Sequence, residues 1–289
     1  MFIIENEYLK VVISKLGAEL VSIFNKQNEL EYLWQGDPLY WGKRAPVLFP
    51  IVGKLKNDAY SFKGQKYILK QHGFARDMYF EMAHQLSETI TFSCKSDNYT
   101  RRSYPFDWIL EIMYTLKFNT LITTAKVKNL SVKRKMLFSI GFHPAFNVPL
   151  VKGKELFEDY NLYFNNDIEG NRWMIKNGLI DSIHKPAFDL GRIPLVVDLF
   201  KEDALVFKNL NSDTITLQSS ATKIGLNFRF NSSPYLGIWS KYEAPFVCIE
   251  PWWGIADAVN HNGDFESKEG IIILDSGHSF SCGYEVELF

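Results

Sequence analysis

Apolar and polar side chains alternate with a period of two along much of the chain. Bulky apolar residues occupy every even position from 110 to 118 and again from 224 to 230. Shorter alternations occur at 90–94 and 215–217. Because successive side chains of a strand point to opposite faces of a sheet, each of these segments predicts a half-buried β-strand.

Strand signals also dominate elsewhere, and helical signals are few. Apolar segments at 9–13 and 20–24 flank Gly17 and predict an N-terminal hairpin. Residues 155–160 predict a turn or one short helix. Strands and helices do not alternate, which argues against a parallel α/β fold. We therefore predict an all-β protein, a single large antiparallel β sandwich with one domain over residues 1–289. Residues 157–192 are rich in Asn, Asp, Gly and Lys, and are interpreted as a loop-and-hairpin excursion from it.

Composition adds an unusual number of aromatic rings to this picture. Phe, Tyr and Trp make up 15% of the 289 residues. The simplest interpretation is a large β core, because aromatic residues favour strands. The alternative adds a ligand groove lined with rings, which would suit the apolar faces of sugars.

Charge and hydropathy exclude several classes of function. Lys and Arg number 32 and Asp and Glu 33, a net charge of −1, which argues against general nucleic-acid binding. No apolar run approaches 18 residues, so no membrane span is expected. The first residues lack the basic-then-apolar pattern of a signal peptide, which favours a cytoplasmic protein.

Four segments interrupt the alternation and group chemically useful residues: 44–54, 71–76, 141–146 and 248–257. Glu250 is the most informative of these residues, because it follows an apolar strand at 246–249 and precedes two tryptophans. Desolvation raises the pKa of a carboxyl group, as a general base working near neutral pH requires. The alternative is a buried carboxylate paired with an arginine.

Two histidines are further candidates. The alternative for each is a structural hydrogen bond at a strand end, and for His72 on its own this alternative is the favoured interpretation. His143 precedes Pro144, which biases its backbone to an extended conformation. His72 lies 71 residues earlier in the sequence. Neither this separation nor the spacing of the three cysteines is typical of a metal site or a disulfide framework, so we predict no metal.

These segments, together with 9–23, 31–34, Trp239 and an expected closing strand at 274–280, resemble the aldose 1-epimerase (galactose mutarotase-like) family. The similarity runs almost end to end and is greatest to the short bacterial branch linked to lactose and galactose operons. The resemblance implies a single antiparallel β supersandwich. It also implies interconversion of the α and β anomers of an aldohexose such as galactose or glucose, or of a hexose phosphate, without a metal or an organic cofactor.

The resemblance also assigns expected roles to particular residues. Glu250 precedes an Asp-Ala-Val-Asn stretch at 257–260 and matches the catalytic glutamate, which takes the proton of the anomeric hydroxyl. His143 matches the catalytic histidine, which as imidazolium protonates the ring oxygen. His72 matches a second histidine that hydrogen-bonds the sugar. Ring opening, rotation about the C1–C2 bond and closure then give the other anomer.

The residues expected to recognise the sugar depart from the pattern of the larger enzymes. Lys54 replaces an arginine, and Pro-Trp-Trp at 251–253 follows the glutamate. Asp203 is the candidate for the substrate-binding aspartate. Arg76 and Lys54 are expected to contact sugar hydroxyls or a phosphate, the alternative being ion pairs that hold loops. Trp252 is a further expected contact, and the aromatic residues expected nearest the site are Phe74, Phe142, Trp239, Trp252 and Trp253.

Two other functions are alternatives to this one. The altered sugar-recognising residues leave open a non-catalytic carbohydrate-binding or regulatory protein on the same fold. Glycoside hydrolysis would require two suitably spaced carboxylates, and only Glu250 is prominent. Either a monomer or a homodimer is compatible with the sequence.

Overall fold

The computed structural model describes residues 1–230 and 233–289. It is built almost entirely of β-strands, and all pairings between its named strands are antiparallel. The four alternating segments of the sequence form β9 (Thr89–Lys95), β10 (Trp108–Lys117), β20 (Thr214–Ser219) and β21 (Gly225–Arg229). The all-β antiparallel prediction is therefore confirmed.

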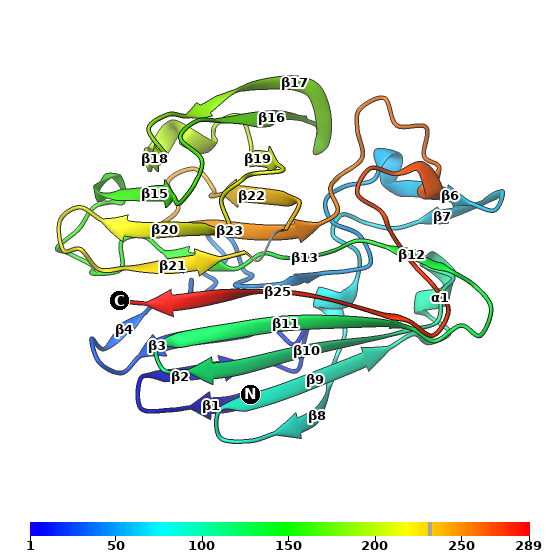
Figure 1. Ribbon diagram of the computed structural model, residues 1–289, viewed down its shortest axis with the longest axis horizontal. Coiled ribbons are helices and arrows are strands. Elements are labelled where there is room, and N and C mark those ends of the chain that lie inside the picture. Colours follow the sequence, from blue (N-terminus) through cyan, green and yellow to red (C-terminus); the bar gives the residue numbers. More distant parts are fainter. Residues whose placement is uncertain (231–232) are drawn as a thin grey trace.

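The largest sheet has nine strands, and four of them, β25, β11, β10 and β9, lie side by side in the lower part of the molecule (Figure 1). Its order is β18 (Arg192–Pro194), β15 (Tyr160–Phe164), β20, β21, β25 (Ser279–Leu288), β11 (Thr120–Asn129), β10, β9 and β8 (Glu81–Gln85).

A second sheet of eight strands carries the candidate site, and its strands β16 and β17 lie at the top of the same view (Figure 1). Its order is β17 (Leu179–Phe188), β16 (Gly170–Lys176), β19 (Leu205–Lys208), β22 (Tyr235–Trp239), β23 (Phe246–Trp253), β13 (Ile140–Phe142) and β5 (Val47–Leu48), and β14 (Ala145–Asn147) also pairs with β23.

Smaller elements complete the fold. The N-terminal sheet contains β1 (Phe2–Glu5), β2 (Leu9–Ile13), β3 (Leu20–Asn25) and β4 (Leu30–Glu31). Two pairs stand apart, β6 (Ala59–Phe62) with β7 (Gln65–Ile68) and β12 (Met136–Phe138) with β24 (Ile272–Leu274). The helical pieces are α1 (Thr100–Ser103) and the 3₁₀ turns η1 (Lys56–Asp58), η2 (Ala75–Asp77), η3 (Phe157–Asp159), η4 (Val197–Phe200) and η5 (Phe265–Ser267).

Two of the local predictions agree with these elements, and one does not. The hairpin around Gly17 is confirmed as β2 paired with β3, and η3 is the short helical turn expected at 155–160. The single closing strand predicted at 274–280 is wrong. β24 ends at Leu274, and a turn containing Ser276 and Gly277 separates it from β25. Small polar residues and glycine favour such a turn.

One continuous apolar cluster fills the space between the sheets and extends from Ile4 to Leu288. Both large sheets contribute to it, and Trp108 is among its largest fully buried side chains. This continuity supports one domain over residues 1–289, which stays a prediction. None of the helices in the described ranges is long and apolar enough to cross a membrane.

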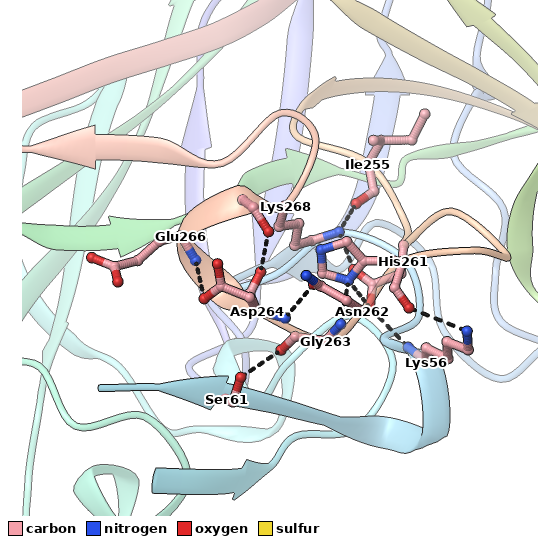
Figure 2. A network of polar contacts seen from close by, with 11 residues as sticks. Lys56, Ser61, Ile255, His261, Asn262, Gly263, Asp264, Glu266 and Lys268 are labelled. Atoms are coloured by element: carbon pink, nitrogen blue, oxygen red, sulfur yellow. Dashed lines mark hydrogen bonds and ion pairs between the residues drawn. The ribbon is translucent and has the colours of Figure 1, made fainter. Parts of the chain in front are cut away.

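A buried ion pair fixes the segment that follows β23, and Figure 2 shows the network of polar contacts around it. The Lys268 ammonium donates to the Asp257 carboxylate at 2.9 Å and to the Ile255 carbonyl at 2.5 Å. The other carboxylate oxygen accepts the Lys56 backbone N–H at 2.9 Å. His261 lies 3.3 Å from the same oxygen. Asp257, the first residue of the Asp-Ala-Val-Asn stretch, therefore joins this segment to residues 54–56, next to the candidate site.

Replacing Lys268 with methionine is expected to lower the free energy of unfolding by about 3–5 kcal/mol, because it leaves a buried carboxylate without its partner. Both side chains of the pair are almost fully buried. Urea denaturation would measure the change. Lys201→Met is the control, because Lys201 makes a 2.8 Å ion pair with Asp198 at the exposed surface, and such pairs contribute little. Equal effects of the two substitutions would contradict the prediction.

Candidate functional site

Strand β23 is buried on both faces, and its alternation separates core residues from site residues. Val247 and Ile249 belong to the main core. Cys248, Glu250 and Trp252 point to the other side of the sheet, because side chains two residues apart share a face. The prediction that Glu250 ends its strand is wrong: β23 continues for three residues beyond it. The carboxyl group is consequently only 2% exposed.

A break between two short strands places His143 beside Glu250. β13 pairs with β23 through Gly141 and Trp252, and β14 pairs with the same edge of β23 from Ala145 onward. His143 lies in the gap between β13 and β14, and its Nε2 is 3.2 Å from Oε2 of Glu250. At this gap β23 has a proline, which lacks an N–H and so leaves no donor unpaired.

Aromatic packing fixes the His143 ring. Trp41 stacks on it with ring centroids 4.8 Å apart and an interplanar angle of 30°. Trp239 and His72 meet it edge-on at 5.8 and 5.9 Å. Within the described ranges, its buried Nδ1 has no hydrogen-bond partner. The ring is therefore oriented by its neighbours' surfaces, and the Trp41 face can stabilise a positive charge on it.

His72 is held through both its backbone and its ring. Its backbone N–H donates to the Gly53 carbonyl at 2.9 Å, and the Gly53 N–H donates to Nδ1 at 3.2 Å. A neutral ring that accepts at Nδ1 carries its proton on Nε2. Burial lowers the pKa of His72 well below its ordinary value, and the nearby His143 and Arg76 add to this. His72 is therefore neutral, and its Nε2 lies 3.3 Å from the side-chain amide nitrogen of Gln71.

Burial shifts the two central groups in opposite directions. It raises the pKa of Glu250 well above its ordinary value; the nearby Trp252 indole opposes this shift, and the charge of Asp203 reinforces it. It lowers the pKa of His143 to about 3, with Arg76 reinforcing the shift. The low-dielectric site thus favours the neutral forms of both groups. A carboxylic acid beside a neutral imidazole holds the same number of protons as a carboxylate beside an imidazolium, so moving one proton across the 3.2 Å contact interconverts the two states.

These groups open into a cavity of about 310 Å³. This is near the lower end of the about 300–1,000 Å³ typical of small-molecule sites. Six of the seven residues predicted for the site line it: His72, Arg76, His143, Asp203, Glu250 and Trp252. The structure therefore brings together residues from four separate segments of the chain.

The seventh predicted residue, Lys54, lies next to the cavity and is not among the residues that line it. Its ammonium donates to the Asn177 carbonyl at 3.4 Å, and its stem packs near Gly178. This contact ties the β16–β17 hairpin to the loop that carries Gly53. A sugar contact by Lys54 stays a prediction.

The aromatic residues divide between the site and the core. Trp239 and Trp252 line the cavity. Phe142 is buried in the main core, and Phe74 and Trp253 pack against it, so the expectation for these three is wrong. Their side chains extend from the core face of their segments. Trp41 was missed, because nothing in its local sequence indicates that it meets His143.

The sequence also gave no indication that the excursion at 157–192 contributes to the site. Its β16–β17 hairpin forms one edge of the eight-stranded sheet and supplies Ile175, Gly178 and Ile180 to the cavity wall. The buried thiol of Cys248 also lies close to the pair: ligand atoms of His143, Cys248 and Glu250 are all within 4.8 Å of one another. Sequence spacing did not predict this convergence.

Two glycines allow the Trp252 indole to lie flat on the sheet as the floor of the cavity. Gly141 is opposite Trp252 on β13, and Gly237 is opposite Glu250 on β22. A Cβ atom on Gly141 would come within 2.7 Å of the indole, and one on Gly237 would overlap its six-membered ring. The strands on both sides of β23 thus have a glycine at the position where a larger residue would collide with the Trp252 side chain.

Gly237→Ala is expected to tilt the indole into the cavity and to weaken the binding of a ligand there about tenfold, a loss of about 1.4 kcal/mol. Overpacking should also lower stability by about 1–3 kcal/mol. Binding titrations followed by tryptophan fluorescence and thermal unfolding would measure the two effects. The double variant Gly237→Ala with Trp252→Phe tests the cause, because a smaller ring should relieve the overlap and recover stability. A folded single variant with unchanged binding would contradict this role for Gly237.

The chain is similar in sequence to one known protein family over almost its whole length. The family model described as aldose 1-epimerase matches residues 1–282. The plasmid-encoded protein LacX of Lactococcus lactis subsp. lactis is 36% identical over 276 residues, which cover 92% of this chain and 91% of that protein.

Solved structures of similar proteins have the same fold as this chain. A galactose mutarotase related enzyme from Lactobacillus acidophilus is 39% identical, with a TM-score of 0.95 over 100% of this chain and 97% of that one. A galactose mutarotase-like protein from Lactobacillus casei is 32% identical, with a TM-score of 0.93 over 100% of both chains. The chain therefore has the galactose mutarotase-like fold.

Proposed function

Because the chain belongs to the aldose 1-epimerase family, we propose that it interconverts the α and β anomers of an aldohexose by acid–base opening and closure of the sugar ring. The observation that carries this proposal is the buried contact between Glu250 and His143 at 3.2 Å. The two groups lie close enough to serve adjacent oxygens of one substrate, the anomeric hydroxyl and the ring oxygen.

In the proposed reaction, Glu250 as carboxylate accepts the proton of the anomeric hydroxyl while His143 as imidazolium donates a proton to the ring oxygen. The C1–O5 bond breaks, and the aldehyde forms. Rotation about C1–C2 presents the other face of the carbonyl, and the same two proton transfers in reverse close the ring. Each correctly placed acid or base contributes about 10²–10⁴-fold to the rate.

The charge-separated form of the pair is required for this step, although burial favours the neutral form. Moving one proton from Glu250 to His143 produces it without exchange with solvent. The Trp41 ring stacked on His143 stabilises the charged form. The hydroxyl groups of a bound sugar would stabilise it further. The pair is thus set to react when a sugar is present.

The remaining cavity residues are proposed to position the sugar. His72 donates from Nε2, Asp203 accepts from hydroxyl groups, and the Trp252 ring supports the apolar face of the sugar. Arg76 is the single Lys or Arg among the described residues that line the cavity, and its guanidinium also donates to the Gln71 carbonyl at 3.0 Å. One partly engaged cation favours a neutral aldohexose, such as galactose or glucose, over a hexose phosphate.

Exchange spectroscopy by NMR tests the proposal on galactose, glucose and their 6-phosphates. We expect the protein to accelerate anomer exchange of at least one neutral hexose well above the rate in buffer. Arg76→Met should weaken a phosphorylated substrate far more than a neutral one, which separates the two substrate classes. No acceleration on any sugar of the panel would overturn the proposed activity.

The same panel distinguishes the second candidate, a sugar-binding or regulatory protein without turnover. Binding is measured through tryptophan fluorescence, because Trp41, Trp239 and Trp252 line the cavity. Saturable quenching by a sugar with no anomer exchange would support the second candidate and exclude the first.

A further inference from the structure

We propose that His143, Cys248 and Glu250 together form a site for one soft or borderline divalent cation, Zn²⁺ or Cd²⁺, whose binding blocks the cavity. This inference does not depend on the proposed mutarotase activity. It rests on the convergence of an imidazole nitrogen, a thiol sulfur and a carboxylate oxygen whose ligand atoms all lie within 4.8 Å of one another.

The distances suit tetrahedral coordination. Zn–N and Zn–O bonds of about 2.0–2.2 Å place adjacent nitrogen and oxygen ligands about 3.3–3.5 Å apart. Nε2 of His143 and Oε2 of Glu250 are already 3.2 Å apart. A Zn–S bond of about 2.3 Å requires the sulfur to be about 3.6 Å from the other two atoms. The Cys248 sulfur lies within 4.8 Å of both atoms, so it has to approach each of them by no more than about 1.2 Å.

The fold holds the three donors on one surface. Cys248 and Glu250 are two residues apart on β23 and share its site face. His143 faces both from the break between β13 and β14, where Ala145 pairs directly with Cys248. The donors thus come from two hydrogen-bonded segments, so little backbone order has to be created when the ion binds.

The charges balance in a place where an unbalanced charge would be costly. All three side chains are buried. A divalent cation with one thiolate, one carboxylate and one neutral imidazole gives a net charge of zero, which avoids the penalty of a lone buried charge. The thiol proton and the proton that Glu250 and His143 hold between them are both released to solvent as the ion binds. A thiolate ligand favours Zn²⁺ or Cd²⁺ over Mg²⁺ or Ca²⁺, which prefer oxygen ligands.

Three protein ligands leave one coordination position open. His143 and Glu250 both line the cavity, so this position would face the space where a ligand enters and would hold a water molecule. The ion would use the same two atoms that the proposed acid and base need. Bound metal and anomer exchange are therefore mutually exclusive.

Titration of the reduced, metal-free protein with Cd²⁺ tests the site directly, without any need for turnover. We expect thiolate-to-metal charge-transfer absorption in the ultraviolet that saturates at one ion per chain. Co²⁺ should give the visible spectrum of a four-coordinate site. If the proposed activity is also correct, Zn²⁺ should inhibit anomer exchange and a chelator should restore it.

Cys248→Ala is expected to remove the absorption and to weaken binding by more than the about 10–100-fold that loss of a supporting residue costs a metal site. Cys94→Ala is the matched control, because it removes another buried thiol, on β9, and should leave the titration unchanged. If Cys248→Ala does not fold, Cys248→Ser and Glu250→Gln provide the same comparison. The absence of saturable absorption in the wild type, or its persistence in folded Cys248→Ala, would overturn the site. Failure of anomer exchange alone would not affect this result.

Discussion

Glu250→Gln is expected to slow anomer exchange by about 10²–10⁴-fold or more, because the amide keeps the shape of the side chain and removes its ability to accept a proton from the sugar. The neighbouring strands already hold the side chain in place, so the loss should appear in kcat. NMR exchange spectroscopy would measure the rate, and tryptophan fluorescence would show whether the sugar still binds. A folded Glu250→Gln protein with a wild-type rate would show that the assigned base is wrong.

The same substitution should leave the protein as stable as the wild type or more stable. Burial disfavours the ionised form of Glu250, and a neutral amide of the same size removes that penalty. Glu31→Gln is the matched control. Glu31 is another largely buried carboxyl group whose pKa is raised by burial, and it accepts hydrogen bonds from Ser22 and from two backbone N–H groups. It lies outside the cavity, so its substitution should change stability without changing the rate.

Replacing His143 with phenylalanine is the second substitution expected to have a large effect, also about 10²–10⁴-fold on the rate. A phenyl ring preserves the stack on Trp41 and the edge contact with Trp239. It lacks both ring nitrogens, so no group remains to protonate the ring oxygen of the sugar. Circular dichroism and thermal unfolding should confirm a native fold. A rate within about tenfold of wild type would assign the acid to another residue.

The two substitutions together test whether the residues act as one unit. Groups that share a single proton are strongly non-additive, because removing either one already disables the pair. We expect the double variant Glu250→Gln with His143→Phe to be no slower than the slower single variant by more than about tenfold. Rate losses that simply multiply would indicate two independent roles and would argue against proton sharing across the 3.2 Å contact.

Sequence patterns predicted the fold well because the relevant signal is local. Alternation in β9, β10, β20 and β21 is visible within each strand, since it reflects one buried and one exposed face. β23 carries no such signal, because both of its faces are buried. For that reason, nothing in the local pattern indicated that the strand continues past Glu250 to Trp253.

The sequence predicted a site residue only where that residue interrupted its local pattern or matched a motif of the family. Glu250, His143 and His72 were predicted in this way, and all three line the cavity. Their distances were not predictable, because they depend on the break between β13 and β14 and on the contact of His72 with Gly53. Trp41 and Cys248 were missed for the same reason: each reaches the site through long-range packing that leaves no local pattern.

The alternation along β23 has a consequence for how proteins with this fold can diverge. A one-residue insertion or deletion within β23 would exchange its two faces, turning Ile249 toward the cavity and Glu250 into the apolar core. We therefore expect a change in the length of β23 to disrupt both folding and the proposed reaction. The turn that carries Asp203 lies between η4 and β19, outside this strand. We therefore expect substitutions at Asp203 to be the simpler way to change sugar preference, while the strand that holds Glu250 is kept at constant length.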